Sequence, residues 1–217
     1  MNQILNFYDD FSMSHSNKKN ISIIYKIVFF TSMFFLIVLL IYYFYIQYNY
    51  GKDELLAEKI VDNFNISSLY SQNSNYEAIN TSYSDSTKSE FSVIGIIEIP
   101  EIGINYPIIS TISEEYLKIS PCRFYGPLPN EIGNLCIAGH NYNNYKGFSR
   151  LKKLKLNDTI NIYSLSGEKT IYHVYKKYEV NSDDFSCTNQ NTNGKRELTL
   201  ITCNNIKSKR TVIKAKV

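Results

Sequence analysis

Cys203, His140 and Arg210 are the residues whose types and positions can do chemistry together. Cys203 ends the strand-like run Thr-Leu-Ile-Thr-Cys and is followed at once by two asparagines, so its thiol is expected at a strand end beside a polar loop. His140 likewise ends the run Cys-Ile-Ala-Gly-His, and Arg210 opens the last strand-like run. A thiol, a proton donor and a cation for an oxyanion are the parts of a cysteine acyl-transfer site. The alternative is a buried structural cysteine, an isolated histidine and a solvated arginine.

The other three cysteines lack this context. Cys136 lies in an apolar strand-like run, which predicts core packing, whereas Cys122 and Cys187 lie in segments expected to be loops. A Cys122–Cys187 disulfide and two free thiols both remain open. The chain has no Cys-x-x-Cys and no paired histidines at metal-ligand spacing, so neither a metal nor a cofactor is predicted.

A strand-rich region must position these residues. Short helices are predicted at 113–119 and 147–154, between β-branched or apolar runs. The runs predicted as strands are 93–99, 104–109, 135–138, 159–163, 171–180, 198–202 and 211–217. Seven or eight short strands with few helices indicate an all-β-dominated fold, either a closed barrel or a sandwich.

A membrane anchor is predicted near the N-terminus. Residues 27–46 carry no charge, and about 20 residues at 1.5 Å each span the roughly 30 Å of a bilayer's hydrocarbon core. No small-residue cleavage site follows, and tyrosines crowd the exit between Tyr42 and Tyr50, which favours an uncleaved anchor over a secretory signal; a buried core helix is the alternative. Three lysines precede the run and two follow it closely, which favours a cytosolic N-terminus.

The predicted organisation has four parts. Apolar residues at every fourth position predict a helix over 52–64, while Asn, Ser, Thr and Tyr dominate 65–90. Hydrophobic residues make up 44% of the chain, too many for disorder throughout, and a net charge of +3 gives no case for a nucleic-acid partner. The parts are a cytosolic tail (1–26), the anchor (27–46), a helical and then flexible extracellular stalk (47–90) and a catalytic domain (91–217).

Residues 91–217 resemble the sortases, transpeptidases of Gram-positive cell surfaces. Thr-Leu-Ile-Thr-Cys at 199–203 matches their nucleophile signature, Ala-Gly-His-Asn at 138–141 matches their catalytic-histidine strand, and Arg210 matches their catalytic arginine. The resemblance implies an eight-stranded β-barrel with short helices, which agrees with the strand count. It also implies that Cys203 is the nucleophile, His140 the proton donor and Arg210 the oxyanion-binding residue, with Thr202 as a supporting, substrate-contacting residue.

The resemblance implies the reaction and its partners as well. The substrates would be surface proteins with a C-terminal sorting motif similar to Leu-Pro-x-Thr-Gly, cleaved between Thr and Gly through an acyl-thioester. The amine of a peptidoglycan precursor or of a pilin would resolve that intermediate. Some class A relatives bind calcium through acidic loop residues, but the loop acids Glu114, Glu115, Asp183 and Asp184 are expected to be merely solvated, and no metal is predicted.

The subclass and the outcome of the reaction stay open. No Asp-Pro-aromatic lid occurs in 49–90, and the stretch from His140 to Cys203 leaves no room for the large inserted helix of class B, so a compact enzyme of class A, D or E is favoured. The alternatives are a pilin-assembling sortase, a hydrolase that uses water as the acceptor, and a catalytically silent, membrane-tethered β-barrel that only binds.

Overall fold

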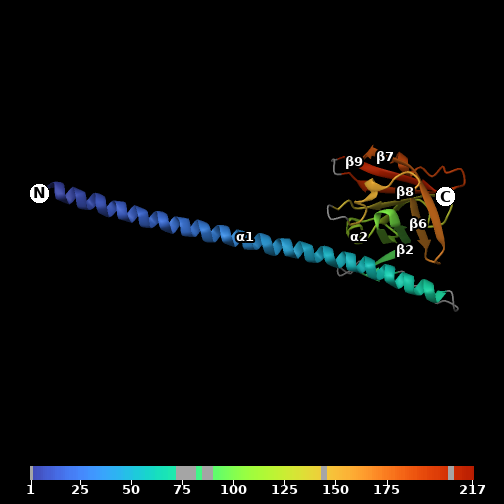
Figure 1. Ribbon diagram of the computed structural model, residues 1–217, viewed down its shortest axis with the longest axis horizontal. Helices are drawn as coiled ribbons and strands as arrows, with labels where there is room; N and C mark the ends of the chain where they lie inside the picture. Colours follow the sequence, from blue (N-terminus) through green and yellow to red (C-terminus); the bar gives the residue numbers. More distant parts are fainter. Residues whose placement is uncertain (1, 72–81, 85–89, 143–145, 205–207) are drawn as a thin grey trace. The chain divides into compact units, whose positions relative to one another are not determined.

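The computed structural model describes residues 2–71, 82–84, 90–142, 146–204 and 208–217. It divides the chain into two compact units, Met1–Tyr50 and Gly51–Val217. Helix α1 (Asn2–Ser71) runs from the first unit into the second (Figure 1). In the first unit the large apolar side chains from Ile23 to Tyr45 are all exposed, and so is Tyr48. The stretch Ile23–Phe64 has a window of mean hydropathy 2.5 and is long and apolar enough to cross a membrane.

The second unit is built on a closed β-barrel. The described strands form one sheet in the order β1-β2-β3-β4-β5-β8-β9-β7-β6, and an additional β2–β6 pairing closes β2 to β9 into an eight-stranded barrel. The strands are β1 (Ser82–Ser84), β2 (Glu90–Ile99), β3 (Ile104–Ile109), β4 (Cys122–Tyr125), β5 (Gly133–Gly139), β6 (Thr159–Ser164), β7 (Lys169–Asn181), β8 (Arg196–Cys203) and β9 (Lys209–Lys216). The β3–β4 and β5–β8 pairs are parallel, and the others are antiparallel.

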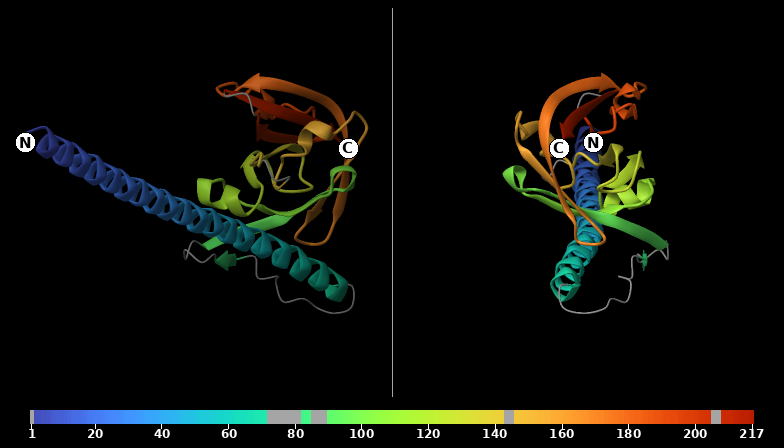
Figure 2. Two further views of the ribbon diagram at one scale, coloured as in Figure 1. Left: turned by 60° about the vertical axis from the view of Figure 1, so that its left-hand side comes forward. Right: turned by 90° about the vertical axis from the view of Figure 1, so that its right-hand side faces the viewer.

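Strand β7 turns the sheet, which helps to close the barrel. Its first residues pair with β6 and its later residues with β9, and a bulge lies between Val174 and Lys176. Figure 2 shows this long orange strand curving around the barrel. A bulge bends a strand and increases its twist, which is what a closed sheet requires.

Short helices connect the strands. Helix α2 (Glu114–Ile119) begins at Ser113, whose Oγ accepts a hydrogen bond from the Tyr116 N–H at 3.1 Å. Such an N-cap is typically worth about 1 kcal/mol, and it explains why the helix begins there. The remaining elements are single 3₁₀ turns, η1 (Pro100–Ile102), η2 (Leu151–Lys153) and η3 (Ser186–Thr188).

Strand β2 is apolar on both faces because both faces are covered. Ile97 and Ile99 point into the main barrel core with Leu135, Leu198 and Ile213. On the opposite face, two smaller clusters join β2 to α1, through Ile60 with Phe91 and Val93, and through Val61 and Phe64 with Ile96. The end of α1 is therefore part of the packing of the Gly51–Val217 unit, and the continuous β-branched run of β2 follows from burial on two sides.

The structure confirms the all-β-dominated fold and the eight-stranded barrel, with three differences of detail. Cys122, expected in a loop, lies in β4, which is too short and too mixed in polarity to show an alternating pattern. The helix expected at 147–154 is only the turn η2, and α1 runs past residue 64 to Ser71. Within the predicted stalk, residues 72–81 and 85–89 lie outside the described residues, and β1 lies between them.

Candidate active site

Three strand ends bring the predicted site residues together. Because β5 and β8 are parallel, their carboxyl ends meet at one edge of the barrel, where Gly139 pairs with Thr202. His140 and Cys203 are the next residues on the two strands. In the antiparallel β8–β9 pair, Arg210 lies directly opposite Cys203. The barrel topology thus joins residues that are far apart in the sequence.

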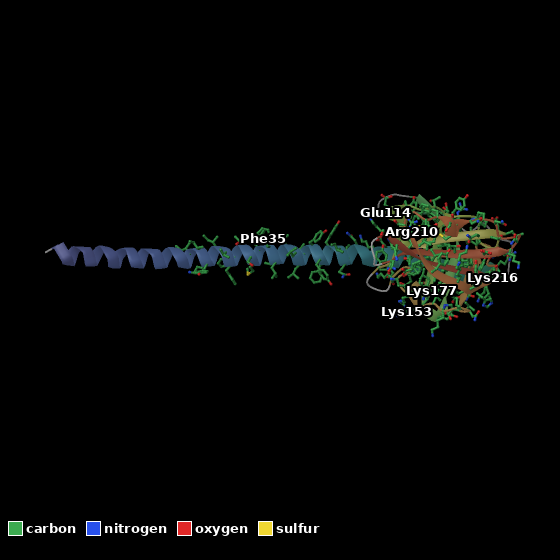
Figure 3. All side chains as sticks on the ribbon, turned by 90° about the horizontal axis from the view of Figure 1, so that it is seen from above. Phe35, Glu114, Lys153, Lys177, Arg210 and Lys216 are labelled. Carbon is green, nitrogen blue, oxygen red and sulfur yellow. The ribbon has the colours of Figure 1, made fainter. Side chains whose placement is uncertain are left out.

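The three side chains line one pocket of about 240 Å³. Thr202 and Glu114 lie in the same wall, and Figure 3 labels Glu114 and Arg210 at the same end of the catalytic unit. The rest of the lining is mostly apolar and consists of Ile112, Leu117, Phe124, Ala138, Gly139 and Ile201. An apolar pocket with a few convergent polar groups is the usual form of a ligand site.

Hydrogen bonds hold the backbone around the thiol. The hydroxyl of Thr202, which is only 3% exposed, donates to the Gly139 carbonyl at 2.8 Å. The Asn141 side chain donates to the Cys203 carbonyl, also at 2.8 Å. Both bonds tie the end of β8 to the end of β5. Thr202 therefore supports the strand end through its hydroxyl while the residue itself lines the pocket.

Cys203 is the exposed one among the four cysteines. Cys122, Cys136 and Cys187 are buried, and all four are free thiols, so Cys122 and Cys187 are not joined by a disulfide. Burial raises the pKa of Cys122 and of Cys136 to about 12. Because the thiolate is the nucleophilic form, these two buried thiols are unreactive and Cys203 is the accessible one.

His140 is half-buried at the base of a closed loop. Burial lowers the pKa of its imidazole below the usual 6.5; the Glu114 carboxylate raises that pKa, and Lys118 lowers it further. The Phe148 N–H donates to the His140 carbonyl at 2.8 Å, which closes the loop. Position 139 must be glycine, because a Cβ there would lie 2.8 Å from the Phe148 ring. The histidine is therefore held in place and is mainly neutral at pH 7.

Arg210 lies against an aromatic ring that belongs to a stacked pair, Phe185 and Phe124. Its guanidinium carbon lies 5.0 Å from the centroid of the Phe185 ring, a distance typical of a cation–π contact. Phe185 in turn stacks on Phe124, with centroids 6.0 Å apart and planes at 13°. No motif in the sequence marks Phe185, which follows the acidic pair Asp183 and Asp184.

Among the described residues, no group of three or more His, Cys, Asp or Glu side chains lies close enough together to hold a metal ion. Glu114 lies in the pocket wall instead, in the first turn of α2. Its position there gives it an electrostatic effect on His140, which the sequence did not predict.

Comparisons with known proteins agree with this geometry. A family model of the sortase domain matches residues 97–217. Sortase A of Bacillus anthracis is 34% identical over 125 residues, which are 56% of this chain and 58% of that protein. The chain therefore spans less than two thirds of that relative's length.

Solved structures of sortases share the fold. The Clostridium perfringens sortase D5 transpeptidase matches with a TM-score of 0.55 and 27% identity, over 74% of this chain and 94% of that chain. Sortase C of the same species, solved with its C-terminal cell wall sorting motif, matches with a TM-score of 0.52 and 24% identity, over 73% of this chain and 87% of that chain. Because the domain match covers more than half of the chain and includes all three strand-end residues, the chain belongs to the sortase family of transpeptidases.

Proposed function

We propose that this protein is a membrane-anchored sortase that cleaves a Leu-Pro-x-Thr-Gly-like motif and joins the released surface protein to a cell-wall amine. One observation carries the proposal. An exposed thiol (Cys203) and a guanidinium (Arg210) lie opposite each other on the paired strands β8 and β9. His140 follows the end of the neighbouring strand β5, and all three residues line one largely apolar pocket. This arrangement supplies a nucleophile, an oxyanion partner and a proton carrier for acyl transfer.

Acylation begins when the Cys203 sulfur attacks the carbonyl carbon of the motif threonine. The thiol proton passes to His140, and the Arg210 guanidinium donates hydrogen bonds to the oxyanion that develops. The Thr–Gly C–N bond then breaks, and the imidazolium gives its proton to the leaving glycine amine. The products are an acyl-thioester on Cys203 and a free C-terminal fragment.

Deacylation reverses these roles with a new amine. The acceptor amine attacks the thioester carbonyl and gives a proton to the neutral His140 imidazole. The C–S bond breaks, and the resulting imidazolium gives its proton to the departing sulfur, which restores the Cys203 thiol and the neutral His140. A low pKa of His140 favours this second step at neutral pH, because the imidazole must be unprotonated to accept the proton.

The pocket lining supports a substrate that is apolar near the cleaved bond. Ile112, Leu117, Ala138 and Ile201 offer aliphatic surface beside the strand-end residues. The leucine and proline of a sorting motif would bury apolar area there, worth roughly 25 cal/mol per Å² removed from water. The sorting-motif complex of the C. perfringens sortase C supports a peptide substrate of this kind.

The exposed apolar surface of α1 supports the membrane anchor. Phe34, Leu39 and Phe44 are each more than 60% exposed in the Met1–Tyr50 unit, and lipid is the natural partner for such a surface. We propose that residues 27–46 span the membrane with a cytosolic N-terminus and an extracellular barrel. A membrane-impermeant maleimide should then label Cys203 in intact cells and fail to label a Cys203→Ala strain.

The deciding experiment is a cleavage profile of the full chain in detergent micelles. Peptides that vary around Leu-Pro-x-Thr-Gly are incubated with several amine acceptors, and products are followed by mass spectrometry. A peptide adduct on Cys203 followed by amide-linked product is expected. Release of the hydrolysed peptide in the presence of every amine would instead identify a hydrolase. Binding without any adduct, in a folded protein, would identify a silent binding module.

A further inference from the structure

A buried polar network outside the catalytic residues holds the connection between β7 and β8. The Lys214 ammonium, on a side chain that is 11% exposed, donates to the Thr199 hydroxyl at 2.9 Å and to the Cys187 carbonyl at 3.2 Å. It also lies 3.5 Å from a carboxylate oxygen of Glu197. The lysine therefore links strands β8 and β9 to the connection that covers them.

Asn134 completes the network from β5. Its fully buried amide donates to the Cys187 and Asn189 carbonyls, both at 3.0 Å, and its Oδ1 accepts from the Thr199 hydroxyl at 2.6 Å. Gln190 exchanges two more hydrogen bonds with the Asn134 backbone, at 2.9 and 3.1 Å. Buried polar groups of this kind are costly unless they are paired, so the network strongly favours one position of the connection.

The residues held by this network, 184–190, also carry the aromatic partner of Arg210. Phe185 is 49% exposed and has its ring on the guanidinium of Arg210, two residues before the anchored Cys187 carbonyl. On the barrel side, Cys187 packs with Ile201 and Val212. The backbone that carries Phe185 is thus held by bonds made away from the pocket, while the ring itself stacks on Phe124.

We propose that Lys214 is a positioning residue that sets the orientation of Arg210 through the 184–190 segment. This inference rests on the proposed transfer reaction for its kinetic consequence, although the anchoring itself does not depend on it. Lys214 does not line the pocket, so its effect on the reaction must pass through the segment it holds. The guanidinium must present a fixed pair of N–H groups to the oxyanion, and a ring stacked on it restricts its rotation.

The kinetic test compares Lys214→Met with Lys216→Met in the full chain in detergent micelles. Both changes remove an ammonium and keep an apolar stem, but Lys216 is exposed and lies over the ring of Tyr175. The Tyr175 hydroxyl donates to Glu197 at 3.2 Å, so Lys216 is one contact removed from the Lys214 ammonium. We expect Lys214→Met to lower kcat for transfer roughly 5- to 30-fold with a smaller change in KM, the size typical of coupled neighbours, and Lys216→Met to leave both unchanged. In a Phe185→Ala background, Lys214→Met should have little further effect.

Amide hydrogen exchange tests the anchoring without a substrate. The Thr188 and Asn189 N–H groups are bonded within the segment, to the Phe185 and Ser186 carbonyls. Their protection should fall in Lys214→Met while the barrel strands stay protected, and it should be unchanged in Lys216→Met. Thr199→Val, which removes the hydroxyl between Lys214 and Asn134, should have the same effect and serves if Lys214→Met does not fold.

Two results would overturn the proposal. One is unchanged exchange at 184–190 in both network variants. The other is an equal loss of kcat on Lys214→Met with and without Phe185, which would indicate a general structural role. A parent protein that transfers no peptide would refute the proposed function instead, and the exchange measurement would still decide whether Lys214 anchors the segment.

Discussion

The rim and the interior of the barrel use the same amino acid for opposite purposes. Cys203 ends β8 at the rim, where its thiol is exposed. Cys136, in the neighbouring strand β5, is fully buried and its pKa is raised by burial to about 12. The two strands run side by side, so the difference comes from position along the strand rather than from the strand itself. Interior positions contribute packing, and the rim positions hold the residues proposed to carry the chemistry.

The comparison predicts which substitutions separate activity from stability. The rim residues Cys203, His140 and Arg210 are exposed or only partly buried beside an open pocket, so replacing them should change the proposed reaction and leave the unfolding free energy nearly unchanged. Interior residues such as Leu200 and Ile213 are fully buried, and replacing them should do the reverse.

The largest expected effect is that of Cys203→Ala. The variant should bind sorting peptide but form no thioester, with a loss of transfer of roughly 10⁴-fold or more, as for other removed nucleophiles. Cys136→Ala is the matched interior change and should keep transfer while losing about 1–3 kcal/mol of unfolding free energy. Mass spectrometry of the adduct and denaturant unfolding measure the two outcomes. Turnover by Cys203→Ala would contradict the assignment of Cys203 as the nucleophile and of the rim as the reactive region.

The next largest effect should be that of Arg210→Lys. A guanidinium offers two N–H groups in one plane, whereas an ammonium is a point charge, so the lysine variant loses the fork while it keeps the charge. Loss of one oxyanion donor costs about 10²–10³ in rate, and we expect a fall in kcat of that order with an unchanged melting temperature. Lys209→Ala, an exposed cation next in sequence, is the control. Equal losses in both variants would indicate a general electrostatic effect.

A smaller effect is expected where α1 packs on the barrel. Ile60 is 2% exposed against β2, whereas Leu55 on the same helix is 54% exposed. Ile60→Ala should lower the unfolding free energy of the Gly51–Val217 unit by about 2 kcal/mol or more, and Leu55→Ala should change it by less than about 0.5 kcal/mol. Denaturant unfolding of the full chain in micelles, followed by near-ultraviolet dichroism, tests this difference. Equal losses of unfolding free energy in the two variants would show that the helix does not contribute to the stability of the barrel.

The smallest expected effect concerns pH. Because burial lowers the pKa of His140, its imidazolium form is lost as pH rises through that lowered value, and little remains at pH 7 to stabilise a neighbouring thiolate. The rate of Cys203 alkylation by iodoacetamide should therefore still rise several-fold between about pH 7.5 and 9, because little imidazolium is present near neutral pH to stabilise the thiolate. A rate that is flat from about pH 6 to 9 and becomes pH-dependent in His140→Ala would show a thiolate–imidazolium pair instead.

Much of the fold was predictable because its strands carry strong local signals. The β-branched run that became β2 and the apolar runs that became β5 and β8 are evident from residue type alone. Strand β4 does not stand out in the sequence because part of its burial comes from Ile60 and Phe91, which are distant in sequence. The order of the strands in the sheet depends on pairings between distant segments, so it could not be predicted from local residue types.

The residues proposed for the candidate site come from the sequence, whereas the residues that support them do not. Motif context identified Cys203, His140 and Arg210, and the register of β5, β8 and β9 brings them together. The Phe185 ring and the Lys214 network were not foreseen, because a lysine in a charged C-terminal strand is usually solvated and no local pattern distinguishes the one that is covered. Their roles depend on where the β7–β8 connection folds back.

The place of β9 in the sheet has a consequence for how the molecule folds. This last strand in the sequence lies between β8 and β7 in the interior of the sheet. Until β9 is made, both neighbours present an unpaired edge, and an open edge can pair with another chain. The pairing of β5 with β8 also joins residues far apart in sequence, and such non-local contacts slow folding. A nascent chain therefore completes both its barrel and the proposed site late, when β9 pairs with β8 and β7. A chain truncated before Lys209 would lack the strand that closes the barrel and carries Arg210.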